Sequence, residues 1–234
     1  MSQNPDPNSP PAEAQDTKDR LIEAGMAVFA ERGFADAGLR EICAQAGANP
    51  AAVNYHFGDK QRFYTEVLAT CHQRAASHRP VPRIADDPDR PDVVLGRFVR
   101  WFLELLLVSS ENDYLGRLMA REMVSPSPSL LEMVRRSLLP IKAVLEEILR
   151  ALLPPDVDDQ TLGLCFASTI SQCLFYKHNQ PVFQAMERIR ATGREDERLQ
   201  AEFPDRNDLD ELAEHITRFA LAGLRAAGYE TDHR

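Results

Sequence analysis

Residues 39–57, LREICAQAGANPAAVNYHF, are the most informative segment of this sequence. Leu39, Ile42 and Ala46 recur at the spacing of one face of an α-helix. Gly47 then interrupts this pattern, at a place where a tight turn needs a positive φ angle that glycine adopts without strain. The first half of the stretch therefore predicts a short helix that ends at a glycine turn.

The second half of the stretch predicts another short helix. Asn49 can cap it through its side-chain oxygen, and Pro50 suits the first helical position, where the missing N–H costs nothing. Val53 is expected to point back at the first helix. Two short helices that cross over a glycine turn form a helix-turn-helix, whose second helix enters the major groove of DNA. The stretch therefore predicts a DNA-reading device.

The segments around the motif make this interpretation more specific. An apolar helical pattern covers residues 17–34, and another helix begins near Asp59, its expected N-cap. AVFAERGF and LREICAQAGANPAAVNYHFGDKQRFYTEVL, both within residues 17–68, resemble the DNA-binding domain of the TetR family of bacterial transcriptional regulators. VNYHFGDK, RLMAREMVSPSPSLL (117–131) and SQCLFYKHNQPVF (171–183) resemble its CecR-like subgroup, which carries its own type of C-terminal domain.

The rest of the chain shows no strand-like alternation, so we predict an all-α fold. Further helices are expected at residues 59–77, 93–108, 114–124, 129–153 (kinked at Pro140), 160–178 and 209–227, with loops at 78–92 and 191–208. We divide the chain into a disordered, Pro-rich arm (1–16), an N-terminal three-helix helix-turn-helix DNA-binding domain (17–64) and a larger helical effector-binding and dimerisation domain (65–229).

Charge and composition narrow the class of protein. The net charge is −9, and within residues 17–68 acidic side chains slightly outnumber basic ones. Salt screens charges beyond about 8 Å, so phosphate binding depends on individual side chains rather than on net charge. This balance disfavours an architectural protein that coats DNA, and favours a site-specific binder with a modest salt dependence.

The location of the protein follows from its apolar segments. The first sixteen residues lack the basic and apolar regions of a signal peptide. The most apolar run, residues 98–108, contains Arg100 and Glu104 and is too short to span a bilayer. We therefore expect a cytoplasmic protein with no membrane partner.

The predicted DNA contacts lie on or beside the second helix of the motif. Tyr55 can contact a phosphate or a base, or it can fill the core, and Asn54 can bind adenine or simply cap the helix. Arg40 can reach a base edge or a phosphate, and Lys60 is a phosphate contact or a free surface lysine. His56 can contact DNA or pack into the core. Ala51 and Ala52 can touch a thymine methyl group, or they can only be small enough to let the helix approach the DNA. The candidates are Arg40, Asn49, Pro50, Ala51, Ala52, Asn54, Tyr55, His56 and Lys60.

The last two predicted helices suggest a homodimer. Residues 160–178 and 209–227 bear apolar groups on more than one face, which a single core does not use fully. The resemblance implies that these helices pack into a four-helix dimer interface, and two recognition helices can read a near-palindromic site. The interface or core candidates are Leu162, Phe166, Ile170, Leu174, Ile216, Phe219 and Leu224.

The resemblance also implies a small-molecule effector pocket in the larger domain. Such pockets are mostly apolar with a few polar anchors. The alternative is that the Met and aromatic stripe forms core, and that Arg121 and Glu122 form an ion pair without a ligand. The candidates are Phe98, Trp101, Phe102, Leu105, Met119, Arg121, Glu122, Met123 and Gln172.

Four cysteines and six histidines raise the alternative of a metal- or thiol-sensing regulator. Cys71, His72 and His78 lack the spacing of a tetrahedral metal site. Cys165 and Cys173 lie eight residues apart in an apolar helix and are expected to be buried and unreactive, and Cys43 is expected to pack where the two helices of the motif cross. No nucleophile elbow, phosphate loop or zinc-protease motif supports an enzyme, so we predict no metal, cofactor or catalytic residue.

These observations predict a homodimeric transcriptional regulator. We expect it to be a repressor that binds double-stranded, palindromic operator DNA and leaves it when a small-molecule effector binds. The alternative from another class is a helical binding protein that uses the helix-turn-helix for protein interaction only. Sequence-specific DNA binding distinguishes the two.

Overall fold

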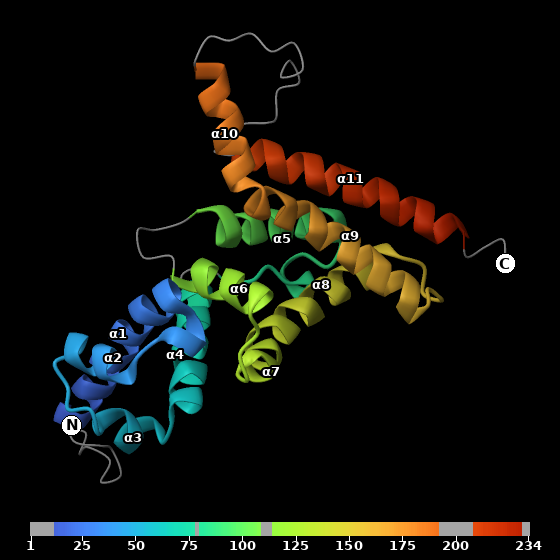
Figure 1. Cartoon of the computed structure of the whole chain (residues 1–234). Helices are drawn as coiled ribbons and strands as arrows, with labels where there is room; N and C mark the ends of the chain where they lie inside the picture. Colours follow the sequence, from blue (N-terminus) through green and yellow to red (C-terminus); the bar gives the residue numbers. More distant parts are fainter. Residues whose placement is uncertain (1–11, 78–79, 109–113, 192–207, 231–234) are drawn as a thin grey trace, which may run out of the picture. The chain divides into compact units, whose positions relative to one another are not determined.

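The structure is a computed structural model, and it describes residues 12–77, 80–108, 114–191 and 208–230. Every regular element in these ranges is helical (Figure 1), which confirms the predicted all-α fold. The helices are α1 (Ala12–Asp36), α2 (Leu39–Gln45), α3 (Ala52–Phe57), α4 (Lys60–Ser77), a 3-10 turn (Ile84–Asp86), α5 (Pro91–Leu107), α6 (Tyr114–Val124), α7 (Leu130–Met133), a π-helical turn (Val134–Leu138), α8 (Leu139–Leu152), α9 (Asp159–His178), α10 (Gln180–Ala191) and α11 (Leu209–Glu230).

Some of these bounds differ from the sequence predictions. α1 begins at Ala12, so residues 12–16 of the predicted disordered arm are helical, while residues 1–11 lie outside the described residues. α10 occupies a segment for which the sequence predicted no element, and the predicted loop at 191–208 falls almost entirely outside the described residues. None of the described helices is both long and apolar enough to cross a membrane.

The chain forms two compact units. Unit 1 contains α1 to α4 together with α6 and α7, and unit 2 contains α5 and α8 to α11. α6 belongs to unit 1 because it packs on α1 and α4. The predicted boundary at residue 64 would separate α6 from the helix-turn-helix. The compact units therefore divide the chain differently from the predicted functional domains. Those functional domains stay a prediction.

The core of unit 1 is built around aromatic side chains of α1 and α4. Phe29 lies 5.6 Å from Phe63 and 4.6 Å from Tyr64 between ring centroids, and all three side chains are fully buried. Gly25 allows this close packing, because a Cβ there would lie 2.7 Å from Cζ of Phe63. α1 and α4 thus form a closely packed support for the two short helices between them.

The helix-turn-helix forms from the local signals that the sequence carries. Gly47 has a φ angle of 61°, as the predicted turn requires, and the buried Cys43 and Val53 fill the crossing of α2 and α3. Asn49 accepts a hydrogen bond from the Ala51 N–H through Oδ1, at 2.9 Å. This turn places Pro50 before α3, so the prediction that Pro50 occupies the first helical position is wrong by the observed bounds.

The start of α4 matches its prediction. Asp59 caps this helix, because its Oδ1 accepts a hydrogen bond from the Arg62 N–H at 2.8 Å. Gly58 separates α3 from the cap with a φ angle of 87°, a conformation that side chains other than glycine rarely adopt. The connection between α3 and α4 is therefore short and well defined.

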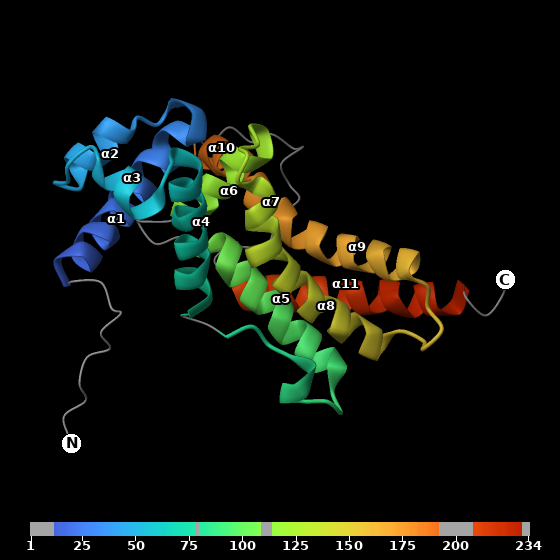
Figure 2. The same cartoon turned by 90° about the horizontal axis from the view of Figure 1, so that it is seen from below.

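Unit 2 is a group of packed helices around a second core. α11 packs on α5 and α9, and α5 also packs on α9; α9 runs beside α11 in both views (Figures 1 and 2). α8 adds Leu145, Ile148 and Leu149 to the core, all fully buried. The π-helical turn Val134–Leu138 lies just before Pro140, where the sequence predicted a kink, so the helical run is continuous but irregular there.

Candidate nucleic-acid interface

The outward face of α3 carries the principal candidates. Ala51, Asn54 and Tyr55 are spaced as one helical face, and all three are exposed. Tyr55 is 80% exposed, which excludes its core alternative. Val53 and Phe57 on the other side are buried. α3 therefore presents a tyrosine and an asparagine to solvent while its opposite face holds it to unit 1.

The remaining candidates on α3 and its turn differ in exposure. Asn49 and Pro50 are exposed beside the turn, whereas Ala52 and His56 are half-buried. The His56 ring meets the Tyr55 ring edge-on, with centroids 4.9 Å apart, and lies 6.1 Å from the Phe57 ring. His56 thus supports Tyr55 from the side, between the exposed face and the core.

Lys60 is not a free surface lysine, because it makes contacts within unit 1. Its Nζ donates a hydrogen bond to the Ala35 carbonyl oxygen at 3.0 Å and lies 5.1 Å from the centre of the Phe34 ring. Burial lowers the pKa of Lys60, and the nearby Asp36 carboxylate opposes that shift. Lys60 ties the start of α4 to the end of α1, and because an ammonium has three donors, it retains donors for a phosphate.

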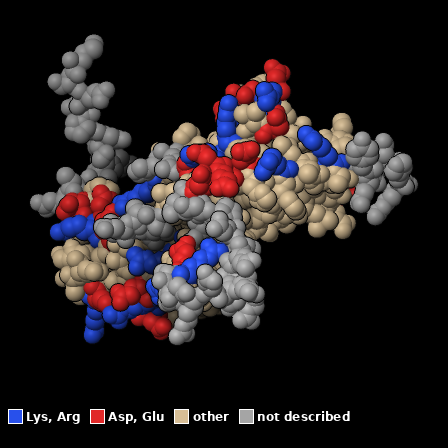
Figure 3. Space-filling model, turned by 90° about the horizontal axis from the view of Figure 1, so that it is seen from above, with Lys and Arg blue, Asp and Glu red and all other residues tan. Residues whose placement is uncertain are grey.

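Two other basic side chains lie near α3. Arg40 is exposed on α2, as a DNA contact requires. Lys18 of α1 places its Nζ 5.9 Å from the centre of the Phe57 ring, close to the end of α3. Sequence reasoning missed Lys18, since only the packing of α1 brings it there. The face shown in Figure 3, seen from above the view of Figure 1, carries basic and acidic side chains intermixed.

The predicted effector-pocket residues do not come together in one compact unit. Phe98 and Trp101 of α5 are buried in the core of unit 2, and Phe102 and Leu105 lie at its edge. The candidates on α6 belong to unit 1 instead, where Met119 packs against its core.

The three other candidates on α6 have structural contacts or face solvent. Arg121 donates hydrogen bonds to the carbonyl oxygens of Ala30 and Glu31, and Glu122 accepts one from Tyr64. Met123 is 62% exposed. The prediction of an Arg121–Glu122 ion pair is replaced by separate bonds from each side chain to α1 and α4. Sequence periodicity could not show this, because it does not identify the helix that a side chain faces.

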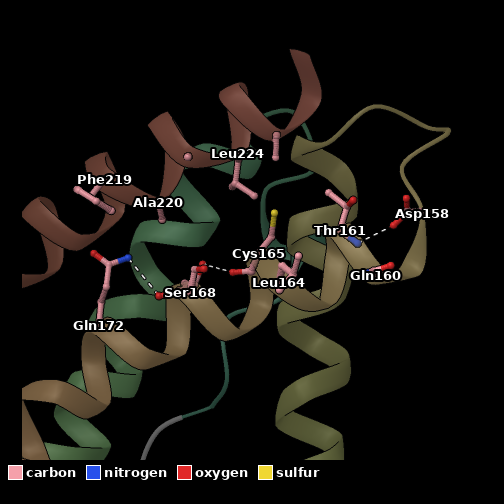
Figure 4. Close-up of a pocket in the computed structure, with 13 residues that line it drawn as sticks. Asp158, Gln160, Thr161, Leu164, Cys165, Ser168, Gln172, Phe219, Ala220 and Leu224 are labelled. Carbon is pink, nitrogen blue, oxygen red and sulfur yellow. Dashed lines mark hydrogen bonds between the residues drawn. The ribbon is translucent and has the colours of Figure 1, made fainter. Parts of the chain in front are cut away.

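A groove of about 600 Å³ lies between α9 and α11 (Figure 4). Gln172, from the predicted pocket set, lines it and donates a hydrogen bond to the Ser168 carbonyl oxygen at 3.3 Å. In Figure 4, Leu224 of α11 and Cys165 of α9 both point into the groove. The lining residues are Asp158, Gln160, Thr161, Leu164, Cys165, Ser168, Thr169, Gln172, Phe219, Ala220, Gly223, Leu224 and Ala227.

The predicted interface residues divide into core and surface. Leu162, Ile216 and Leu224 are buried in the core of unit 2, although Leu224 also lines the groove. Phe166, Ile170 and Leu174 are half-buried, whereas Phe219 is 63% exposed. On α9 and α11, the exposed large apolar residues that the prediction missed are Leu164 and Phe175.

The cysteines are free thiols in mostly buried positions. Burial raises the pKa of Cys173 to about 12, and it also raises the pKa of Cys165. Cys43 and Cys71 are buried, as is Cys173, but Cys165 is only half-buried because it lines the groove. The expectation that Cys165 is fully buried is therefore wrong.

Two family models match the chain. Residues 21–67 match the model of the bacterial regulatory proteins of the TetR family. Residues 91–224, more than half of the chain, match the C-terminal domain of the HTH-type transcriptional dual regulator CecR. The chain belongs to the TetR family, in its CecR-type group. These two matches confirm the resemblance to the TetR family and to its CecR-like subgroup.

Individual relatives agree with this membership. The HTH-type transcriptional regulator SrpR of Pseudomonas putida is 41% identical over 59 residues, which cover 25% of this chain and 28% of SrpR. The HTH-type transcriptional dual regulator CecR of Shigella flexneri is 33% identical over 126 residues, 48% of this chain and 54% of CecR. The chain thus spans about half or less of these relatives, which are transcriptional regulators rather than enzymes.

A solved structure extends the similarity in fold to most of the chain. The hemolysin II transcriptional regulator HlyIIR has a TM-score of 0.58 and 19% identity, over 87% of this TetR-family chain and 98% of that structure. This likeness concerns the helical fold. It covers the helix-turn-helix and the larger helical domain alike.

Proposed function

We propose that the protein is a sequence-specific DNA-binding transcriptional regulator that acts as a repressor. The observation that carries the proposal is the exposed Tyr55 on the outward face of α3, beside Asn54. A large aromatic side chain left in solvent on a short, firmly packed helix suits a contact in the major groove. Membership of the TetR family supports the same function.

The side chains around α3 have separate roles in this proposal. Asn54 makes two hydrogen bonds to an adenine edge and so reads sequence. Tyr55 binds the DNA backbone, and Arg40, Lys60 and Lys18 bind phosphates on the flanking strands. Phosphate contacts fix the register of α3, and the asparagine then selects the base.

We further propose that two copies of the chain bind one near-palindromic operator. TetR-family regulators bind operator DNA as dimers. Here the exposed apolar side chains Leu164, Phe175 and Phe219 lie on α9 and α11. Gly163 and Gly223 are also exposed, and a Cβ at either would meet no atom within 4 Å. Small residues of this kind let two helices approach closely, so this face, which includes Phe219 of the predicted set, suits a second copy better than the buried Leu162 and Ile216.

A small-molecule effector completes the proposed mechanism. The protein has one conformation that matches the operator and another that does not. An effector releases the protein from DNA only if it binds the second conformation more tightly than the first. Within unit 2 we place the effector beside Phe102 and Leu105 of α5, the predicted α5 residues that are only partly buried. This assignment depends on family membership and on the apolar character that such pockets share.

Operator binding tests the proposal directly. The purified protein is mixed with a labelled duplex from the region upstream of its own gene, and fluorescence anisotropy is compared with that of a scrambled duplex at physiological salt. We expect a preference of about 10³ or more for the upstream duplex, and Tyr55→Ala should weaken binding to both duplexes. Val124→Ala is the matched control, because Val124 is also an exposed apolar residue of unit 1. If neither this duplex nor any selected from a random pool is preferred, the proposal is wrong.

A further inference from the structure

A buried carboxylate links α6 to the helices that support the recognition helix. Glu122 of α6 is only 2% exposed. Its Oε1 accepts a hydrogen bond from the Tyr64 hydroxyl of α4 at 2.8 Å. Its Oε2 accepts two more, from the Ser127 N–H at 3.0 Å and the Ser127 hydroxyl at 3.1 Å. One side chain thus ties α4 to the turn that follows α6.

Further bonds from the same turn reinforce this link. Ser129 is almost fully buried, and its Oγ accepts a hydrogen bond from the Thr65 hydroxyl at 2.9 Å. The same oxygen donates to the Gln61 carbonyl at 3.3 Å. The residues between α6 and α7 therefore bind α4 at consecutive turns of that helix.

α6 also holds the end of α1. Nε of Arg121 donates a hydrogen bond to the Ala30 carbonyl oxygen at 2.9 Å, and its guanidinium also donates to Glu31. These carbonyls belong to the last regular turn of α1, before Gly33 adopts a φ angle of 78°. A cation near the carbonyl groups at the end of a helical segment interacts favourably with the helix dipole.

Tyr64 is connected to the recognition helix, α3, through the neighbouring residue on α4. Tyr64 follows Phe63 on α4, and the Phe63 ring lies 4.6 Å from the ring of Phe57, the last residue of α3. Burial raises the pKa of Tyr64, and its bond to Glu122 raises it further, so the phenol keeps the proton that it donates. A shift of Tyr64 along or around α4 would move Phe63 and with it the end of α3.

A purely stabilising role does not account for a carboxylate at this place. Burying a charge is costly, and apolar side chains of similar size often stabilise such a contact equally well. What a hydrogen-bonded carboxylate adds is direction, since its oxygens accept donors only where Tyr64 and Ser127 place them. The bonds therefore fix one register between α4 and α6.

We infer that Glu122 is a positioning residue for operator recognition, which acts through Tyr64 and α4 to hold α3 in the orientation that DNA requires. The inference rests on the proposed function. It assigns to α6 a part in DNA binding itself, in addition to any part in binding an effector.

Tyr64→Phe and Glu122→Gln test the inference. We measure affinity for the operator and for a scrambled duplex at a temperature well below the thermal midpoint of each variant. Operator affinity should fall roughly 3- to 30-fold in each variant, the range for coupling residues that do not touch the ligand. Non-specific affinity should stay within about twofold, because the phosphate-binding side chains remain. The double variant should lose less than the product of the two single losses, since the two residues share one bond.

Controls separate positioning from stability. Glu147→Gln and Tyr176→Phe change the same residue types in unit 2 and should leave the specificity ratio unchanged. If Tyr64→Phe and Glu122→Gln lower the thermal midpoint but keep the operator affinity and specificity of the wild type, the residues are structural and the inference is overturned. If Glu122→Gln does not fold, Tyr64→Phe alone decides, because it removes a single oxygen. A wild-type protein that prefers no duplex overturns the proposed function first and the inference with it.

Discussion

Neighbouring residues on α3 divide the work of DNA binding between affinity and specificity. Asn54 and Tyr55 share an exposed face, yet only the amide has a donor and an acceptor that match the edge of adenine. The phenol of Tyr55 is suited to phosphate, which is the same at every base pair. Substitutions at the two positions should therefore have different signatures.

Asn54→Ala should relax base preference at one operator position. We expect a loss of about 1–3 kcal/mol in discrimination against the wrong base at that position. Competition between operators altered at single base pairs measures this loss. Tyr55→Ala should instead weaken binding to all duplexes to a similar extent. Unchanged affinity and specificity in Asn54→Ala would exclude its role as a base contact.

Lys60 combines a structural bond with an expected phosphate contact. Lys60→Ala should lower affinity for all duplexes and reduce the slope of log affinity against log salt by about one. Loss of its bond to Ala35 should also lower thermal stability slightly. Lys142→Ala, in unit 2, is the control and should leave the slope unchanged. A slope identical to that of the wild type would show that Lys60 serves only the fold.

At the scale of elements, the packing of α1 against α4 determines how firmly α3 is supported. Gly25 lies where these helices meet, and the rings of Phe63 and Phe57 continue the contact to α3. The same scale governs the proposed interface, where exposed small residues of α9 and α11 leave room for another helix. The contact at Gly25 has no room for a Cβ, whereas Gly163 and Gly223 face open space in the single chain.

Gly25→Ala should destabilise unit 1. The new Cβ would lie 2.7 Å from Cζ of Phe63 and 2.9 Å from Cγ2 of Val67, so both side chains must move. Overpacking of this kind costs about 1–3 kcal/mol, despite the better helix propensity of alanine. Urea unfolding of the variant measures the cost. A stability equal to that of the wild type would mean that α1 and α4 can separate freely at this point.

Gly223→Leu should weaken the dimer without harming the single chain. A Cβ at this position meets no atom within 4 Å, and leucine favours a helix more than glycine by about 0.8 kcal/mol. Sedimentation velocity should show a larger fraction of monomer, together with lower operator affinity. Ala143→Leu, on the exposed face of α8, is the control and should not change association. An unchanged dimer would place the interface elsewhere.

For the molecule as a whole, stability should depend on pH through the imidazole of His72, which is half-buried but has a buried Nε2. Burial lowers the pKa of His72 on α4 to about 4, and its Nε2 is buried with no hydrogen-bond partner among the described residues. Between pH 6.5 and pH 4 the unfolded chain binds a proton that the folded chain does not. The stability that the folded chain gains from keeping His72 neutral is therefore fully present above pH 6.5 and is lost as pH falls toward 4.

The expected size of this effect is about 2 kcal/mol between pH 7 and pH 5. Urea unfolding at the two pH values measures it. His72→Leu should flatten the dependence, because leucine fills a similar space and does not titrate. His215→Leu, at an exposed histidine of α11, should not. A pH dependence equal in His72→Leu and the wild type would show that other groups cause it.

The helix-turn-helix, most of the helices and the family can be predicted from the amino-acid sequence. The reason is that their signals are local: Gly47 makes its own turn, and Asp59 caps a helix three residues away. Which side chains contact one another, by contrast, depends on the tertiary structure. Glu122 was predicted as a pocket anchor, yet it binds Tyr64, 58 residues away. Phe219 is exposed and Ile216 buried on the same helix. Helical periodicity reveals that a face is apolar, but only packing between distant segments decides what covers it.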